Sequence, residues 1–192
     1  MKRSILPLLV LLAAFSPLVV AAQIVEPTPT PDPHIYDDPG MHYVAPPDSV
    51  LLSQQMQHPA LSDLSQDPSV IVAWGLGKTQ DDAKIISIAM ETYGGSLEGF
   101  ESQFENQLRG NDDTVLVKSR TPATLQNGMP AYFVEVTEGS GFDTRKQFAY
   151  VWIDGARGVV LSVSAPLGAI DENQAKQLLA GATAVRYPPD AQ

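Results

Sequence analysis

The chain has 192 residues, no cysteine and more acidic than basic side chains, with a formal net charge of −10 at pH 7. Without cysteine it cannot form a disulfide, a zinc–thiolate site or the lipid anchor that lipoproteins carry on a cysteine. Its negative charge repels phosphate backbones and anionic lipid surfaces, so the composition argues against nucleic-acid and membrane-surface partners.

Residues 1–22 have the pattern of a secretory signal peptide. Lys2 and Arg3 form a short basic start, an apolar run follows, and the stretch ends in Val20-Ala21-Ala22, which suits cleavage before Gln23. We expect a mature protein in the periplasm or outside the cell, with no membrane attachment after cleavage. The alternative is an uncleaved membrane anchor, but two prolines interrupt the run. Loss of the two basic residues brings the expected net charge to about −12.

Residues 23–39 are predicted to be a disordered, proline-rich linker. Prolines alternate with polar residues in EPTPTPDPHIYDDP, and such a run favours polyproline or extended geometry without strand pairing. We expect one folded domain at residues 40–187 and a short tail at 188–192. A domain of this size can fold without a disulfide or a bound metal.

Short apolar segments separated by turn residues predict the strands of this domain. Segments 70–75 and 84–92 should pair with each other, and Asn127-Gly128 and Asp154-Gly155 should each close a hairpin. Segment 50–52 should extend the first strand or pair with it. The expected strands are 41–45 (with 50–52), 70–75, 84–92, 115–125, 131–137, 145–153 and 159–165.

Two amphipathic helices are predicted. In residues 96–109, apolar side chains recur at spacings of three and four, Ser96 can cap the start, and Gly110 can end the helix. Its outward face, which we expect to be solvated, consists of Glu101, Gln103, Glu105 and Asn106. In residues 171–182, Asp171 and Gln174 form a capping-box pattern. Hairpins combined with helices predict the α+β class, an antiparallel sheet covered by helices in an α/β/α sandwich.

The order of these segments resembles the PsbP-like fold over residues 40–187. The matching features are a strand that ends in prolines (MHYVAPP), a VIVAWG strand, an S-L-x-x-F helix start and L-x-N-G-M-P-A-Y at 125–132. Asp48-Ser49-Val50 departs from the bacterial pattern, which has an aromatic residue there. This fold is shared by extrinsic PsbP subunits of photosystem II, a Ran-binding protein and bacterial envelope proteins of unknown function. The resemblance implies a non-catalytic binding or assembly role without identifying a partner.

One cluster contains residue types that bind metals, namely His34, Asp37, Asp38 and His42. Two imidazoles and two carboxylates could hold zinc or another divalent ion. However, flanking prolines keep the segment irregular, and no two histidines have helical spacing. These four residues are therefore weak metal candidates, and we expect no resident cofactor.

Nucleophilic catalysis has little support. Ser140 lies in Gly139-Ser140-Gly141 and not in G-x-S-x-G, and the histidines are limited to His34, His42 and His58. A triad would have to be assembled from distant residues. The acidic pairs 81–82 and 112–113 lack an EF-hand pattern, and WGLGKT lacks P-loop spacing. Four aromatic residues, Trp74, Phe148, Tyr150 and Trp152, are interpreted as sheet core and not as a ligand cage.

These observations predict a secreted or periplasmic, non-catalytic binding or accessory protein with a protein partner in the cell envelope. Two alternatives remain open. One is a hydrolase with a site assembled from scattered residues, and the other is a carrier of a metal or small ligand that uses residues 34–42.

Overall fold

The computed structural model describes residues 32–38, 40–54, 68–110 and 114–184. The chain divides into two units, residues 1–30 and 31–192, and every described residue belongs to the second. The predicted leader, the first part of the predicted linker and the predicted tail lie outside the described residues. Within these residues, no helix is long and apolar enough to cross a membrane.

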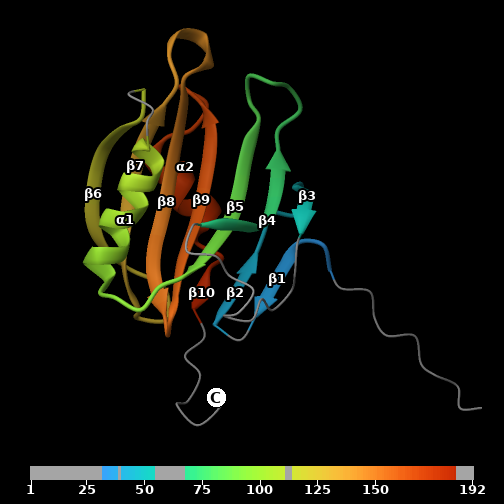
Figure 1. Cartoon of the computed structure of the whole chain (residues 1–192). Helices are drawn as coiled ribbons and strands as arrows, with labels where there is room; N and C mark the ends of the chain where they lie inside the picture. Colours follow the sequence, from blue (N-terminus) through green and yellow to red (C-terminus); the bar gives the residue numbers. More distant parts are fainter. Residues whose placement is uncertain (1–31, 39, 55–67, 111–113, 185–192) are drawn as a thin grey trace, which may run out of the picture. The chain divides into compact units, whose positions relative to one another are not determined.

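Seven strands form one antiparallel sheet in the order β3-β4-β5-β9-β8-β7-β6 (Figure 1). The predicted pairing of segments 70–75 and 84–92 is confirmed as β4 with β5. The hairpins predicted at Asn127-Gly128 and Asp154-Gly155 are confirmed as β6–β7 and β8–β9. The strands are β3 (Val50–Gln54), β4 (Ser69–Leu76), β5 (Lys84–Thr92), β6 (Leu116–Thr124), β7 (Pro130–Glu138), β8 (Arg145–Asp154) and β9 (Arg157–Pro166).

A second antiparallel sheet of three strands has the order β1-β2-β10, with β1 (Ile35–Asp38), β2 (Met41–Val44) and β10 (Thr183–Ala184). Two predictions are corrected here. Residues 35–38, assigned to the linker, form β1, because no proline lies within this stretch and β2 supplies a partner. Segment 50–52 does not pair with β2 but forms β3 and pairs with β4.

Two α-helices cover the large sheet, α1 (Leu97–Arg109) and α2 (Glu172–Leu179). Ser96 caps α1 through a bond from the Gly99 N–H (3.1 Å), and the capping box of Asp171 and Gln174 is present at α2. Helix α2 is shorter than predicted, because the chain continues into β10 and pairs with β2. The α+β prediction is confirmed, with a helix on each face of the sheet.

Two apolar clusters hold these layers together. The larger lies between the large sheet, α2 and the small sheet, and its buried aromatic side chains include Tyr43 and Trp74, whose ring centroids are 5.4 Å apart. The smaller lies under α1, where Phe100 and Phe104 pack on β7, β8 and β9. Both predicted core tryptophans, Trp74 and Trp152, are 0 % exposed, so their interpretation as core is confirmed.

The predicted solvated face of α1 is wrong at Glu101 and only partly correct at Gln103 and Glu105, which are half-buried. Glu101 is 0 % exposed, and its carboxylate accepts a bond of 2.5 Å from Arg120 on β6. Gln103, also expected to be solvated, is half-buried, and its side-chain amide donates to the carboxylate of buried Glu91 on β5 (3.0 Å). A single-helix pattern could not anticipate this, because α1 covers polar as well as apolar positions of the strands beneath it.

The α1 face of the sheet is covered over only part of its width. Helix α1 contributes to a cluster with residues of β7, β8 and β9, and Figure 1 shows it in front of that half of the sheet. The other half, formed by β3, β4 and the start of β5, has exposed apolar side chains. They are Val50 (65 %), Leu52 (57 %), Val70 (43 %) and Ile85 (40 %).

Candidate functional site

A tight turn joins β4 to β5 at one end of the large sheet. Gly77 has a φ of 102°, which glycine adopts readily and other residues do not. The Asp82 carboxylate accepts bonds from the Thr79 N–H (2.7 Å) and the Thr79 hydroxyl (2.8 Å). The bond from the Thr79 backbone is the main cause that holds the pKa of Asp82 below its ordinary value. This hydrogen-bonded turn carries Gln80 and Asp81.

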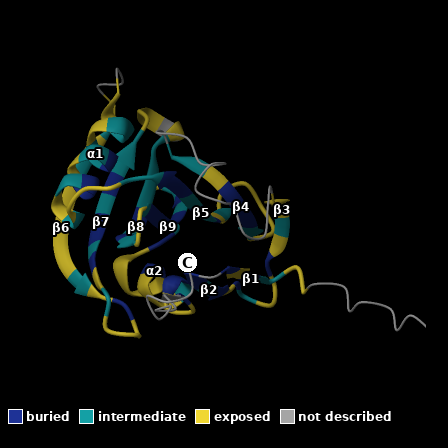
Figure 2. Ribbon diagram, turned by 60° about the horizontal axis from the view of Figure 1, so that its bottom comes forward, coloured by how far each residue is buried: buried dark blue, intermediate teal, exposed yellow. Residues whose placement is uncertain are grey.

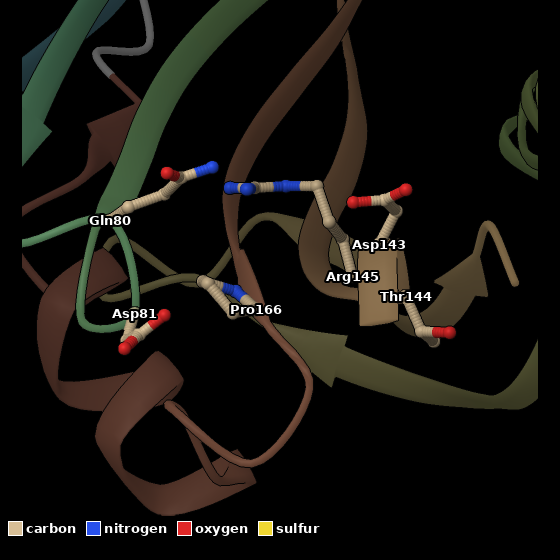
Figure 3. A pocket seen from close by; sticks show the side chains of 6 residues that line it. All are labelled: Gln80, Asp81, Asp143, Thr144, Arg145 and Pro166. Carbon is tan, nitrogen blue, oxygen red and sulfur yellow. The ribbon is translucent and has the colours of Figure 1, made fainter. Parts of the chain in front are cut away.

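Gln80 and Asp81 line one side of a pocket of about 230 Å³. The other side comes from the short 3-10 helix η2 (Gly141–Asp143), the start of β8 and the end of β9. Figure 3 shows the Arg145 side chain reaching toward Gln80, with Asp143 beside it. The lining residues are Gln80, Asp81, Asp143, Thr144, Arg145 and Pro166. The pocket therefore combines one guanidinium with two carboxylates.

Strand β9 fixes the direction of Arg145. Its Nε donates to the Ser164 hydroxyl (3.0 Å), and a terminal nitrogen donates to the Ser164 carbonyl (3.3 Å). A guanidinium has five N–H groups, so these two bonds leave donors for another molecule. A pre-positioned arginine can bind a carboxylate or a backbone carbonyl with little loss of side-chain entropy.

The exposed apolar side chains of β3 and β5 lie next to this arginine on the same face of the sheet. Cross-strand pairing aligns Val50, Gly75, Ile85 and Ser164 in one row, and directly paired residues share a face of the sheet. Leu52 lies on the same face, because its side chain occupies the space where a side chain of Gly75 would be. We call Val50, Leu52, Ile85 and Arg145 the end-of-sheet surface.

The four metal candidates do not form one cluster. Asp37 and His42 are cross-strand partners, with Oδ1 and Nδ1 3.4 Å apart. Asp38 is buried and forms an ion pair with Arg157 (2.8 Å). His34 lies before β1, where its ring contacts Asp32 and the carbonyl of Ser49. In the described part of the chain, no three acidic or histidine side chains form a group that could hold a metal ion.

Among the described residues, Asp32, His34 and Ser49 contain the residue types of a catalytic triad and lie close together. His34 Nδ1 lies 3.1 Å from Asp32 Oδ1, and Nε2 lies 3.0 Å from the Ser49 carbonyl oxygen. The Ser49 hydroxyl, however, donates to the Pro46 carbonyl (2.6 Å). The imidazole therefore contacts the backbone of this serine and not its nucleophilic oxygen, which a triad requires.

The remaining candidates are distributed over separate places. Ser140 immediately precedes η2. Asp81 lies in the pocket, whereas Asp82 holds the turn beside it. His58 and the acidic pair 112–113 lie outside the described residues.

The chain is similar to cyanobacterial PsbP (CyanoP) from Synechocystis sp. PCC 6803, with a TM-score of 0.56 and 12 % identity over 76 % of this chain and 87 % of that one. The chain has a PsbP-like fold. No family model and no curated protein sequence matches it.

The chain is also similar to two further solved structures. LpqN, "involved in cell envelope biogenesis of Mycobacterium tuberculosis", has a TM-score of 0.48 and 16 % identity over 78 % of this chain and 87 % of its own. The Saccharomyces cerevisiae Ran-binding protein Mog1p has a TM-score of 0.43 and 16 % identity over 73 % of this chain and 79 % of its own.

Sequence analysis missed the end-of-sheet surface for two reasons. Its residues come from β3, β5 and β8, so only the tertiary pairing brings them together. The exposed apolar residues also have the same alternating pattern as buried ones. One local signal was present, because Gly75 interrupts an otherwise bulky strand and indicates close approach by another group.

Proposed function

We propose that this chain is an exported, non-catalytic accessory protein that binds another protein through its end-of-sheet surface. The observation that carries the proposal is the combination of exposed apolar side chains with a pre-positioned arginine. Protein-binding surfaces commonly have an apolar centre and a polar rim, and arginine is enriched among the residues that contribute most to affinity. The polar pocket supplies such a rim beside the apolar row.

Contact with a partner would remove apolar area from water. Val50 and Leu52 are each more than half exposed on a sheet face, and burial of apolar area contributes about 25 cal/mol per Å². Ile85 extends the same area toward Arg145. Arg145 can then bond a polar group of the partner at the edge of the contact.

Export is the part of the proposal that rests on residues 1–22. Their pattern of a basic start, an apolar run and small residues predicts cleavage before Gln23. The test is the mass of the intact protein recovered from the periplasm or medium of a bacterium that expresses the full chain. A mature N-terminus at Gln23 supports export, whereas full-length protein confined to the cytoplasm contradicts it.

Binding at this surface can be tested by site-specific photo-crosslinking in the organism that makes the chain. A photoreactive phenylalanine analogue replaces Ile85 in one variant and Leu52 in another. The control variant carries it at Leu116, which is 52 % exposed on the opposite edge strand β6. We expect the same adduct from positions 85 and 52 and none from position 116.

A second variant tests the role of the arginine. Arg145→Ala should weaken formation of the Ile85 adduct by about tenfold, the effect expected when an interface arginine worth roughly 1.4 kcal/mol is lost. Adducts that form equally from all three positions, or none from positions 85 and 52, would overturn the proposal.

A further inference from the structure

The two edges of the large sheet differ in their protection against pairing with another strand. Edge strand β6 has Lys118, Arg120 and Pro122, all exposed. Lysine and proline on an edge strand disfavour pairing with another strand. Edge strand β3, in contrast, has the sequence VLLSQ, which contains neither a charge nor a proline. Figure 2 shows both edges largely exposed.

Strand β3 presents apolar side chains on both faces of the sheet. Leu51 packs against the larger apolar cluster, while Val50 and Leu52 lie exposed on the α1 face. Among the described residues, β3 pairs only with β4. An added strand would therefore find backbone groups along the edge and apolar contacts above it, which are the two components of β-strand addition.

Charge determines which added strand fits. The chain has a formal net charge of −10, and the exposed carboxylate of Asp48 lies two residues before β3. A second copy of the chain would bring equal negative charge to the edge. A basic segment would instead be attracted, and opposite charge also accelerates association.

We infer that β3 binds an extended segment of the partner in which apolar and basic residues alternate. This inference rests on the proposed function. The apolar residues of that segment contact Val50 and Leu52. In an extended strand its basic residues lie on the opposite face, and the net negative charge of the chain attracts them.

The inference can be tested with a fluorescent nine-residue peptide that alternates valine and lysine, added to the full mature chain. Two control peptides have glutamate in place of lysine, or proline in place of the central valine. We expect the lysine peptide to bind at least about tenfold more tightly than either control in fluorescence anisotropy. Its binding should weaken as salt is added, because salt screens the attraction.

Matched variants locate the binding edge. Leu52→Lys should weaken peptide binding by at least about tenfold, since it places a charge on the apolar contact and repels the lysines. Leu116→Lys, at a leucine of similar exposure (52 %) on the opposite edge, should leave binding unchanged. Val50→Lys provides a second test at the 65 % exposed position, and thermal unfolding checks that each variant is folded.

Amide hydrogen exchange identifies the binding mode. Strand addition predicts slower exchange within residues 50–54 when the lysine peptide is present, with no change in β6. Equal affinity of the glutamate and lysine peptides, or unchanged exchange at residues 50–54, would overturn the inference.

The peptide experiment tests the inference about β3, and the crosslinking experiment tests the proposed function, so either can be contradicted without the other. If the Ile85 and Leu52 adducts form but the peptide does not bind, the inference about β3 fails and the proposed function stands. If the peptide binds but those adducts are absent, β3 retains its strand-binding property and the proposed function fails.

Discussion

Two buried carboxylates form ion pairs with arginine, and their surroundings differ. Asp38 accepts hydrogen bonds from two backbone N–H groups (2.7 and 2.9 Å), from the Tyr36 hydroxyl (3.0 Å) and from Arg157. Glu101 accepts one bond from Arg120, and its second oxygen has no hydrogen-bond partner. Both carboxylate side chains are 0 % exposed.

The difference shows that burial alone does not define the role of a charge. Asp38 and Arg157 connect the β1–β2 hairpin to β9, and every carboxylate oxygen of Asp38 is bonded. For Glu101, burial first and then the neighbouring Glu105 carboxylate, through its hydrogen bonding and its charge, raise the pKa to about 7, against the opposing effect of Arg120. The first pair fixes a hairpin in place, whereas the second makes a helix contact sensitive to pH.

Removal of Asp38 should cause the largest loss. Asp38→Ala leaves the largely buried Arg157 guanidinium with only Asp154 as its charged partner, and breaking such a pair costs about 3–5 kcal/mol. Urea denaturation measures the loss. Asp37→Ala, at a 70 % exposed carboxylate on the same strand, should change the unfolding free energy by no more than about 0.5 kcal/mol. Equal effects of the two variants would show that the ion pair does not anchor the hairpin.

A glycine substitution tests the packing of α1 on the sheet without changing its Glu101–Arg120 ion pair. In Gly158→Ala, the new methyl group would collide with the ring of Phe100, a fully buried residue of α1 that packs on the sheet. We expect a loss of about 1–3 kcal/mol in unfolding free energy. Gly94→Ala, where a methyl group meets no atom within 4 Å, is the control. If the two variants are equally stable, α1 can shift to make room for the methyl group without loss of unfolding free energy.

The pH dependence tests the second carboxylate. Because the folded-state pKa of Glu101 lies above its unfolded value of about 4.5, the folded state binds the proton more tightly. Its contribution to stability is complete below pH 4.5 and is lost as the pH rises through about 7. Glu101→Gln should abolish this decline and raise stability at pH 8 by about 1–2 kcal/mol.

Urea titrations at several pH values between 4.5 and 8 follow this effect. Glu98→Gln, at an exposed position of the same helix, should keep the wild-type decline. A decline that persists in Glu101→Gln would assign the pH dependence to another group.

The smallest effect is expected at the helix surface. Arg109 lies 3.5 Å from Glu105 one turn away, and its side chain is 54 % exposed. Arg109→Gln should therefore change the unfolding free energy by no more than about 0.5 kcal/mol. A larger loss of stability in thermal or urea unfolding would mean that Arg109 helps to neutralise Glu101 and Glu105 of the same helix.

Local signals predicted most of the fold. Asn127-Gly128, Asp154-Gly155 and the Asp171 capping box were correct because each depends on residues adjacent in sequence. Strand β1 was missed because the prolines before Ile35 dominated the composition of its segment. Strand β10 is only two residues long and exists through its pairing with β2.

The candidate site was less predictable than the fold. The pocket combines the β4–β5 turn with residues near 143 and 166, which no spacing rule connects. The burial of Glu101 depends on Arg120, 19 residues later and on another element. Asp38 was a metal candidate because it lies close in sequence to two histidines and Asp37, whereas its actual partner Arg157 lies 119 residues away.

The order β1-β2-β10 places the first and last described strands on either side of β2. Residues 41–42 thus pair with residues 183–184, across almost the whole folded unit. During synthesis, the small sheet can close only after the final strand has left the ribosome. Contacts between segments far apart in sequence form slowly, so we expect this pairing late in folding. Truncation before Thr183 should therefore leave β2 with an open edge, even though most of the chain would be present.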